Sequence, residues 1–545
     1  MGSKIAKLFL LVFLMFFSAG VSFADNIPIV RVGISDTSFR KLIYNEVSVI
    51  STEDFALYEK SSSKFIMGFT KGDVLRFIYK NGKFDVEQNG ITVIKNYSGT
   101  LIVHSPNGIL GIDGLKRKSK QAYYHGIFEL IPRNDREFFV VNVLDIQEYL
   151  KGVVPNEMPV HFGLEALKAQ AVAARNYVLM PRTRAYKEFD VDDSVASQVY
   201  FGANTESPVA DQAVDETLGL VALYDWDLIL AQYCSTSGGY TEDYANAFSD
   251  NKLRVFPAQP KPYLKGSPDI YGVESLETEE AARKFYMTRP DSYDINSPYY
   301  RWQKEFERTE LENTLRKTLL AQSKTGFVYP NFSENQDFGD LKELKVLKRG
   351  VSGKIMEMEI ITTKGTWKAS KELVIRRIFQ KNGVALPSAN VVFDHIYDED
   401  GNLEKIIAYG GGFGHGVGMS QFGAGFMAKS LNRNFIDILK RYYSGITIST
   451  VPQTIINKPV DITFYAPHRY GVLVVNNECQ FKELIADING HTFYIPLDKK
   501  LFTNELRIDI SRHLRKGKND IILSLPKYEI GKNLKFYVEL VRKDD

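Results

Sequence analysis

The sequence predicts an α+β protein, in which a mixed central domain is flanked by β-rich regions on both sides. Residues 27–115 consist of short apolar, β-branched segments separated by Gly, Asn, Asp and Ser, and the same pattern returns after Thr450. Between these regions, helical periodicity alternates with strand-like runs. Hydrophobic residues make up 44% of the 545 and aromatic residues 12%, which supplies ample core and argues against disorder. The expected division is an export segment at 1–24, a β-rich domain at 25–120, a mixed domain at 121–450 and a β-sandwich-like domain at 455–545.

The first residues have the pattern of a secretory signal peptide. Lys4 and Lys7 precede an apolar run at 8–17, and small residues follow up to Ala24. We therefore expect export to the periplasm, the cell wall or the exterior. The alternative is a retained membrane anchor, although the apolar core of ten residues is shorter than the ~20 that a spanning helix needs. Membrane contact is expected only in that second case.

The N-terminal β-rich region is expected to contain hairpins. Asn81-Gly82, Asn89-Gly90 and Asn107-Gly108 carry the residues of tight turns. The basic stretch 116–120 is interpreted as a linker to the mixed domain or as a solvated loop. The expected strands are 27–34, 47–50, 55–58, 65–69, 74–79 and 100–103.

The mixed domain contains three clear helical patterns, and the C-terminal region returns to strands. Gly163 and Pro181 set the limits of one helix, and 278–286 and 309–322 are amphipathic. Residues 506–522 resemble a phrase of jelly-roll modules in sugar-processing enzymes. The C-terminal strands are expected at 460–465, 472–475, 493–495, 521–523 and 534–540.

The charge balance excludes one class of partner. The chain has 68 Lys+Arg against 66 Asp+Glu, and the surplus of two is Lys4 and Lys7. The rest of the chain is balanced, so no excess of cations is available to bind nucleic acid by counter-ion release. Two cysteines exclude a disulfide scaffold and a Cys-rich zinc module, and we predict no cofactor and no metal.

Glu157 is the first candidate for chemistry. Pro155 and Pro159 are expected to hold an extended, stiff loop, which presents Glu157 among apolar neighbours. Such surroundings raise the pKa of a carboxyl group, so that it holds a proton near neutral pH and can act as a general acid. The simpler interpretation is a solvated loop glutamate.

Lys168 and Arg175 lie seven residues apart on the helix after Gly163. Each follows one position after a narrow, Ala-rich apolar seam, so both are expected at the border between core and solvent. The simpler interpretation is that their stems cover the core while their charges reach water.

Two polar segments are candidates for ligand binding. The first is a turn with three hydroxyl side chains and two glycines, in which Ser235, Thr236 and Ser237 suit a polyhydroxyl or anionic ligand. The second is the glycine-rich segment 410–425, which presents His415 and Gln421 and whose glycines let backbone N–H groups approach a ligand. Its spacing fits neither a dinucleotide fingerprint nor a P-loop. A single His without partners is weak evidence for a metal.

Taken in order, these segments resemble the SpoIID/LytB family of bacterial cell-wall proteins. The resemblance spans about 121–450 and leaves the flanking β regions outside. The matching pieces are YLKGVVPNEMP at 149–159, EALKAQAVAARNYV at 165–178, SQVYFG at 197–202, YCSTSGGYTE at 233–242, GFGHGVGMSQFGAGFMA at 412–428 and ILKRYYSGITI at 438–448.

The resemblance implies a lytic transglycosylase that cuts the MurNAc–GlcNAc bond of peptidoglycan glycan strands, intact or denuded, and leaves 1,6-anhydro-MurNAc ends. Glu157 would be the acid and base, supported by Lys168 and Arg175. The substrate-binding residues that it implies are Gln198, Tyr200, Ser235, Thr236, Ser237, His415 and Gln421.

One residue departs from the family pattern, and one alternative function stays open. Cys234 stands where such proteins often have His; a zinc-binding thiol and a small semi-buried residue are the two interpretations, and a bridge from Cys234 to Cys479 is not expected. The alternative function is a non-catalytic peptidoglycan-binding protein that enhances a cell-wall amidase, which would then be a protein partner.

Overall fold

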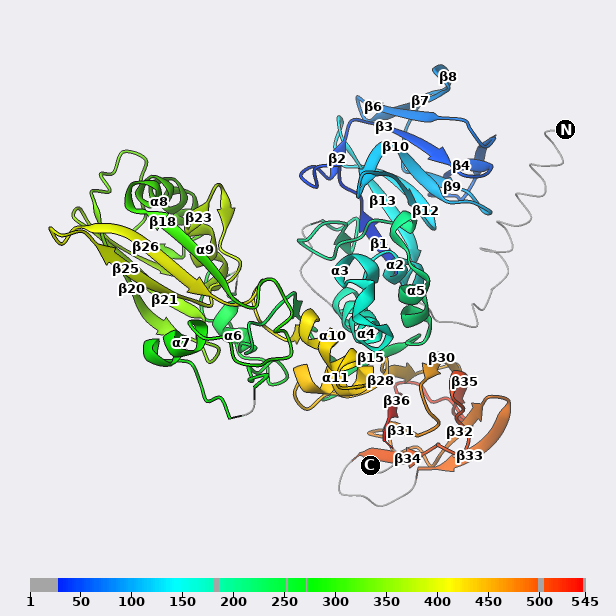
Figure 1. Ribbon diagram of the computed structural model, residues 1–545. Coiled ribbons are helices and arrows are strands. Elements are labelled where there is room, and N and C mark those ends of the chain that lie inside the picture. Colours follow the sequence, from blue (N-terminus) through cyan, green and yellow to red (C-terminus); the bar gives the residue numbers. More distant parts are fainter. Residues whose placement is uncertain (1–27, 181–185, 251–252, 271, 498–503, 543–545) are drawn as a thin grey trace. The chain divides into compact units, whose positions relative to one another are not determined.

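The computed structural model describes residues 28–180, 186–250, 253–270, 272–497 and 504–542 and confirms the α+β class (Figure 1). The chain forms two compact units, Met1–Ile229 with Thr447–Asp545, and Leu230–Ile446. These units do not follow the domain boundaries expected from the sequence, which stay a prediction. The expected signal peptide lies outside the described residues. Among the helices that are described, none is long and apolar enough to cross a bilayer.

The N-terminal part of the first unit consists of two antiparallel-rich sheets made largely of hairpins. Asn81-Gly82 and Asn89-Gly90 turn at positive φ between successive strands, as predicted. Asn107-Gly108 instead joins two different sheets, so the hairpin predicted there is wrong. One sheet has the order β14 (Val191–Asp192), β1 (Ile29–Gly33), β13 (Phe138–Asp145), β12 (Ile127–Pro132), β9 (Leu101–His104), β4 (Phe55–Glu59) and β5 (Phe65–Phe69), with β2 (Ile43–Tyr44) beside β13. The other has the order β11 (Lys120–Tyr124), β10 (Leu110–Arg117), β3 (Glu46–Ser51), β6 (Leu75–Lys80), β7 (Lys83–Gln88) and β8 (Ile91–Tyr97).

The basic stretch 116–120 is part of a hairpin and not a linker, and its residues are exposed except for Arg117, which agrees in part with the predicted solvated loop. Lys118 and Ser119 form the turn between β10 and β11, both at positive φ. Arg117 is buried, and its guanidinium lies 2.5 Å from the carboxylate of Asp193. Burial still raises the pKa of Asp193, so the attraction of Arg117 and the hydrogen bonds from Ser35 offset only part of the cost of burying this carboxylate.

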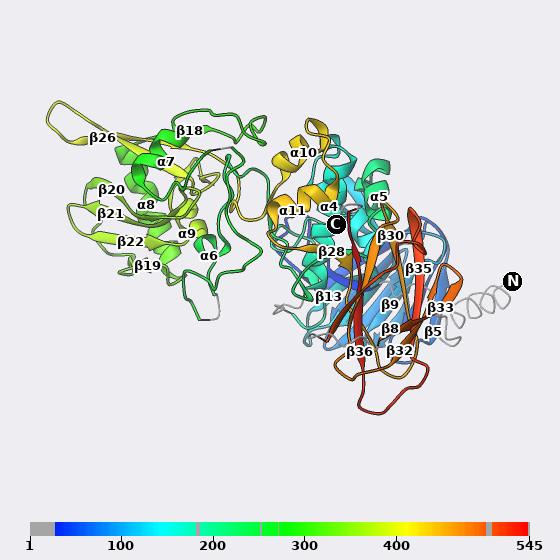
Figure 2. The same cartoon turned by 90° about the horizontal axis from the view of Figure 1, so that it is seen from below.

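The C-terminal strands form two further sheets of the first unit. β36 (Leu534–Leu540) is buried along almost its whole length and lies between β28 (Thr447–Thr450) and β31 (Gly471–Asn476). Through β28, it shares a sheet with β15 (Leu220–Tyr224). This sheet also contains β16 (Asp227–Leu228), β34 (Glu505–Asp509) and β29 (Gln453–Ile455). The other sheet, whose strands are labelled in Figure 2, has the order β30 (Val460–Ala466), β35 (Gly517–Ser524), β32 (Glu483–Ile488) and β33 (His491–Pro496).

The helices of the first unit surround α4 (Leu164–Leu179), which begins after Gly163 as predicted. Residues 166–176 of α4 are buried on every side, because their many alanines let α3, α5 and β15 pack close. The prediction that this helix buries only a narrow apolar seam, with solvent along its edge, is therefore wrong. The remaining helices are α2 (Ile146–Lys151), α3 (Val154–Glu157), α5 (Pro208–Asp215) and the 3-10 turns η1 (Val160–Phe162) and η2 (Ala203–Thr205).

The second unit has its own hydrophobic core. Leu311, Leu315 and Leu319 recur every four residues on α8 (Arg308–Ser323) and pack with Ile360 and Trp367 of one sheet. That sheet has the order β19 (Val328–Tyr329), β22 (Thr366–Ser370), β21 (Ile355–Thr362) and β20 (Leu341–Arg349), and another has β18 (Trp302–Glu307), β26 (Leu403–Gly410) and β25 (Val391–Tyr397). Two short pairs are β17 (Tyr233–Cys234) with β27 (Met419–Ser420), and β23 (Gln380–Lys381) with β24 (Val384–Ala385). The helices are α6 (Tyr244–Ala247), α7 (Glu279–Tyr286), α8, α9 (Glu372–Ile378), α10 (Gln421–Lys429) and α11 (Phe435–Tyr442).

Candidate functional site

Glu157 is the last residue of α3, and the backbone of a distant segment holds its carboxylate. Pro155 lies in the first turn of this short helix, where its missing N–H breaks no hydrogen bond, so the predicted extended loop is wrong. The N–H of Val199 donates to Oε1 of Glu157 at 2.7 Å. The side chain is half-buried, next to the fully buried Val154 and Met158. That the carboxyl group itself lies among apolar side chains stays a prediction.

Gln198 and Tyr200, which flank Val199, are buried in the core. The amide oxygen of Gln198 accepts from the hydroxyl of Tyr149 at 3.1 Å, and the hydroxyl of Tyr200 donates to Asn142 at 2.8 Å. Their exposed fractions are 0% and 1%. This placement corrects the expectation of direct substrate contact, since a buried side chain cannot touch a glycan. The two residues fix the segment that donates to Glu157.

Lys168 lies between two carboxylates. Its Nζ is 2.7 Å from both Glu165 and Glu216. Burial lowers the pKa of Lys168, but the hydrogen bonds to Glu165 and Glu216 outweigh it and raise the pKa. Its charge is used to join α4 to the end of α5, away from the solvent border that the sequence predicted.

Arg175 is fully buried, which lowers its pKa to about 9. Its guanidinium donates to the carbonyl of Leu220 at 2.9 Å and to the amide oxygen of Gln147 at 3.0 Å. Within the described residues its Nε has no hydrogen-bond partner. Arg175 also lines a cavity of about 180 Å³. It thereby ties α2, the helix that leads into α3 and Glu157, to α4 and β15.

In the second unit, the hydroxyl turn points inward onto buried carboxylates. The hydroxyls of Thr236 and Ser297 are 2.7 Å apart. The hydroxyl of Ser237 lies 2.9 Å from Asp294 and 3.1 Å from Asp269. Burial and the charge of Asp294 raise the pKa of Asp269, although Arg441 lies only 2.9 Å from it. Ser235 is the half-buried member of the turn.

The glycine-rich segment packs directly against this turn. Phe413 and Thr236 exchange backbone hydrogen bonds of 2.9 and 3.3 Å, and β27 pairs in parallel with β17. Gly418 has φ +70°, and a Cβ there would lie 2.1 Å from the carbonyl oxygen of Gln232. The structure thus brings together the two predicted binding segments, and the glycines serve the close approach of protein backbones to each other.

His415 is held as a neutral imidazole in this packed region. Its Nδ1 accepts from the N–H of Val417 at 3.0 Å. Burial, with the nearby charges of Lys354 and Arg376, lowers its pKa to about 3. Gln421 begins α10 and is 7% exposed.

Cys234 is a buried free thiol, and Cys479 is also free. Burial raises the pKa of Cys234 to about 12. A metal ligand must be a thiolate, so this environment favours the interpretation as a small buried residue over zinc binding.

Several polar residues that the sequence did not single out lie in or near these segments. Glu242 is buried and accepts from the hydroxyl of Ser352 at 2.6 Å, and burial raises its pKa. His125, Glu148 and Glu206 meet in the first unit. Their separation along the chain fits no ligand motif, so the sequence carries no signal for them.

The ten predicted site residues divide equally between the two units. Those in the first unit are Glu157, Lys168, Arg175, Gln198 and Tyr200, and those in the second are Ser235, Thr236, Ser237, His415 and Gln421.

Comparisons with known proteins match parts of both units. A family described as "Stage II sporulation protein" (SpoIID) matches residues 134–224, and a domain of unknown function matches 249–418. Stage II sporulation protein D of Bacillus subtilis is 32% identical over 325 residues, covering 57% of this chain and 76% of that protein. An uncharacterised protein of Brachyspira hyodysenteriae is 30% identical over 327 residues, covering 60% of this chain and 72% of that one. The amidase enhancer of Bacillus subtilis is 29% identical over 303 residues, covering 55% of this chain and 40% of the enhancer.

Proposed function

Because the chain belongs to the SpoIID family, we propose that it is an exported lytic transglycosylase acting on the glycan strands of peptidoglycan. The observation that carries the proposal is the position of Glu157. This half-buried carboxyl ends α3 within the family-matched segment, and the N–H of Val199 fixes one of its oxygens. The names of its relatives, a sporulation protein and an amidase enhancer, support a role at the cell wall.

One carboxyl group is sufficient for this reaction. Protonated Glu157 gives its proton to the glycosidic oxygen as the bond from C1 of MurNAc breaks. The C6 hydroxyl of the same sugar then attacks C1, and its proton passes to the Glu157 carboxylate. The 1,6-anhydro ring closes, Glu157 is protonated again, and no water is consumed. A hydrolase of the usual type would need a second carboxylate to act on the sugar or on water.

Lys168 and Arg175 serve this reaction as positioning residues. Arg175 holds Gln147 on α2, and Lys168 joins Glu165 to Glu216. Both contacts fix the helices around α3. Within the second unit, the half-buried Ser235 is the member of the hydroxyl turn that a glycan could contact.

The enzyme can be tested with Glu157→Gln, which keeps the size of the side chain and removes its acid–base chemistry. Wild-type protein should release 1,6-anhydro-MurNAc ends from intact sacculi or amidase-treated glycan, as measured by mass spectrometry. The variant should be slower by at least about 10²-fold. Glu334→Gln, which changes an exposed loop glutamate of the second unit, is the matched control and should behave as wild type.

The second candidate function is non-catalytic enhancement of a cell-wall amidase, which the similarity to an amidase enhancer favours. In that case neither substrate yields anhydro ends, the wild type and Glu157→Gln sediment equally with the wall, and the protein raises the rate of an added amidase. That set of results would reject the transglycosylase.

A further inference from the structure

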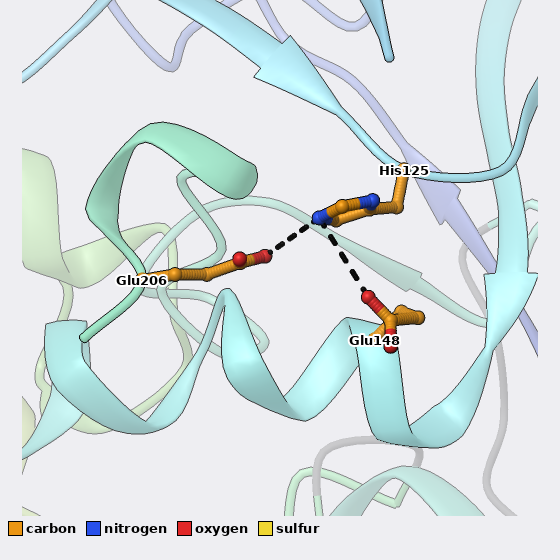
Figure 3. A group of neighbouring side chains, drawn as sticks. All are labelled: His125, Glu148 and Glu206. Atoms are coloured by element: carbon orange, nitrogen blue, oxygen red, sulfur yellow. Dashed lines mark ion pairs between the residues drawn. The ribbon is translucent and has the colours of Figure 1, made fainter. Parts of the chain in front are cut away.

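Three side chains from distant segments converge in the first unit (Figure 3). His125 lies between β11 and β12, Glu148 is on α2, and Glu206 follows η2. Nε2 of His125 is 3.0 Å from a carboxylate oxygen of Glu206 and 3.6 Å from one of Glu148. All three candidate ligand atoms lie within 4.8 Å of one another, and all three residues are half-buried.

A single proton on His125 does not satisfy this arrangement. An imidazole nitrogen carries at most one N–H, yet both carboxylates face the same nitrogen. The carboxylate oxygen of Glu206 is the nearer one, at 3.0 Å, and pairs with Nε2, so it takes up the single N–H. The carboxylate of Glu148, 3.6 Å from the same nitrogen, is then left without that N–H. A cation between the three atoms would satisfy all of them.

The surrounding charges also favour a cation. Asp211 and Asp215 add two more carboxylates near Glu148 and Glu206. Lys151 is the neighbouring ammonium group, 3.1 Å from Oε1 of Glu148 and 3.5 Å from Asp215. This contact turns the other oxygen of Glu148 toward His125. Four carboxylates around one lysine leave an excess of negative charge.

We propose that His125, Glu148 and Glu206 bind a divalent cation of the zinc or manganese type. One imidazole and two carboxylates are a donor set that suits these ions. Metal–ligand bonds of about 2.1 Å place neighbouring ligand atoms roughly 3.0–3.5 Å apart, close to the two contacts of His125. Lys151 then acts outside the ligand set and orients Glu148, as the partners of metal ligands commonly do.

The ion would fasten the segment that supports Glu157. Next to Glu206, the hydroxyl of Thr205 accepts from the amide of Asn156 at 2.7 Å. On the other side, Asn204 accepts from the backbone of Tyr123 at 2.9 Å. A metal between β11, α2 and Glu206 would therefore hold the chain that follows Val199. Its role is structural positioning, and metal binding can be measured without any assay of activity.

The test is titration of the chelator-treated protein with Zn²⁺ alone, with Mn²⁺ and Mg²⁺ in parallel. The wild type should bind one Zn²⁺ with a rise in Tm, bind Mn²⁺ more weakly and show no rise with Mg²⁺. His125→Gln and Glu206→Gln should each weaken Zn²⁺ binding by at least about 10²-fold. Replacing a residue that only orients a metal ligand would reduce the affinity by less. His491→Gln, at an exposed histidine of β33, is the matched control and should bind as wild type.

Circular dichroism and the metal-free Tm identify any variant that has not folded. X-ray absorption of the zinc-loaded wild type gives a readout that needs no variant, and it should show nitrogen and oxygen ligands with one imidazole. Sulfur in the zinc coordination, no binding by the wild type, or wild-type affinity in both folded variants would each overturn the proposal.

Discussion

Single residues of the second unit, two of them buried and His415 half-buried, have pKa values that differ from those of the unfolded chain. His415, Cys234 and Lys354 lie in one packed region, with the imidazole of His415 neutral and the thiol of Cys234 protonated. Burial lowers the pKa of Lys354, and Asn390 accepts from its ammonium group. Such groups make stability dependent on pH, because the unfolded chain titrates at ordinary values.

His415 provides a prediction with a definite sign. Its pKa is about 3 in the folded protein against a usual 6.5, so between these values the unfolded state binds the extra proton. Stability is complete above pH 6.5 and falls as the pH drops toward 3, by about 2 kcal/mol between pH 7 and pH 5. Thermal unfolding of His415→Gln should show a correspondingly flatter dependence on pH. His491→Gln is the control and should keep the wild-type slope; equal slopes in all three proteins would contradict this account.

At the scale of elements, a glycine-rich segment can allow close approach to a ligand or close approach to another part of the backbone. The high density of glycine predicts that this backbone approaches another group closely. In the structure, that group is the backbone of the hydroxyl turn. Which backbone comes close is set by the pairing of β17 with β27, two strands separated by almost the whole second unit. No local pattern in the sequence encodes that pairing.

Gly418→Ala tests this packing. The change forces a side chain into φ +70° and places its Cβ 2.1 Å from the carbonyl of Gln232, so we expect a loss of about 3 kcal/mol or more. Gly401→Ala is the matched control, since Gly401 has φ +77° but nothing within 4 Å of the added Cβ, and it should cost about 1 kcal/mol. Chemical denaturation measures both. Similar losses at the two positions would show that backbone strain alone matters.

At the scale of the whole molecule, the first unit is built from two segments that are far apart in the sequence, and these two segments share a sheet. β36, near the C-terminus, lies in the middle of the sheet that contains β15 from the family-matched segment. The residues after 455 were expected to form a separate domain that binds wall polymer or a partner. Three of their strands, β31, β34 and β36, share a sheet with β15 and β28, whereas β30, β35, β32 and β33 form a sheet of their own.

Deletion of 455–545 should therefore destabilise the first unit. It exposes β28, including the fully buried Ile448, and leaves the edge of the sheet unpaired. We expect Tm to fall by at least about 10 °C, or the protein to aggregate. A chain that ends at Arg542 keeps β36 and should unfold as the full chain does. A deleted protein with wild-type Tm would show that 455–545 folds independently, and its wall binding could then be tested by deletion.

Local patterns determined much of the fold and the first candidate residue. The helix after Gly163, the amphipathic helices α7 and α8 and most strands follow from periodicity and turn residues, which act within a few positions. The ordered family segments identified Glu157 in the same way. These signals could be read because the side chains that produce them are neighbours in sequence.

Only the tertiary structure decided what surrounds those residues. It buried Arg175, because α4 is covered on every side, and it buried Gln198 and Tyr200 against α2 and β13, although sequence placed these residues at a border or a binding surface. It brought His125 to Glu148 and Glu206, although 23 and 58 residues separate these three along the chain. The sequence by itself determined the elements and the catalytic candidate. Burial and convergence were decided by packing between distant segments, because the energy of a buried charge depends on neighbours that no local pattern specifies.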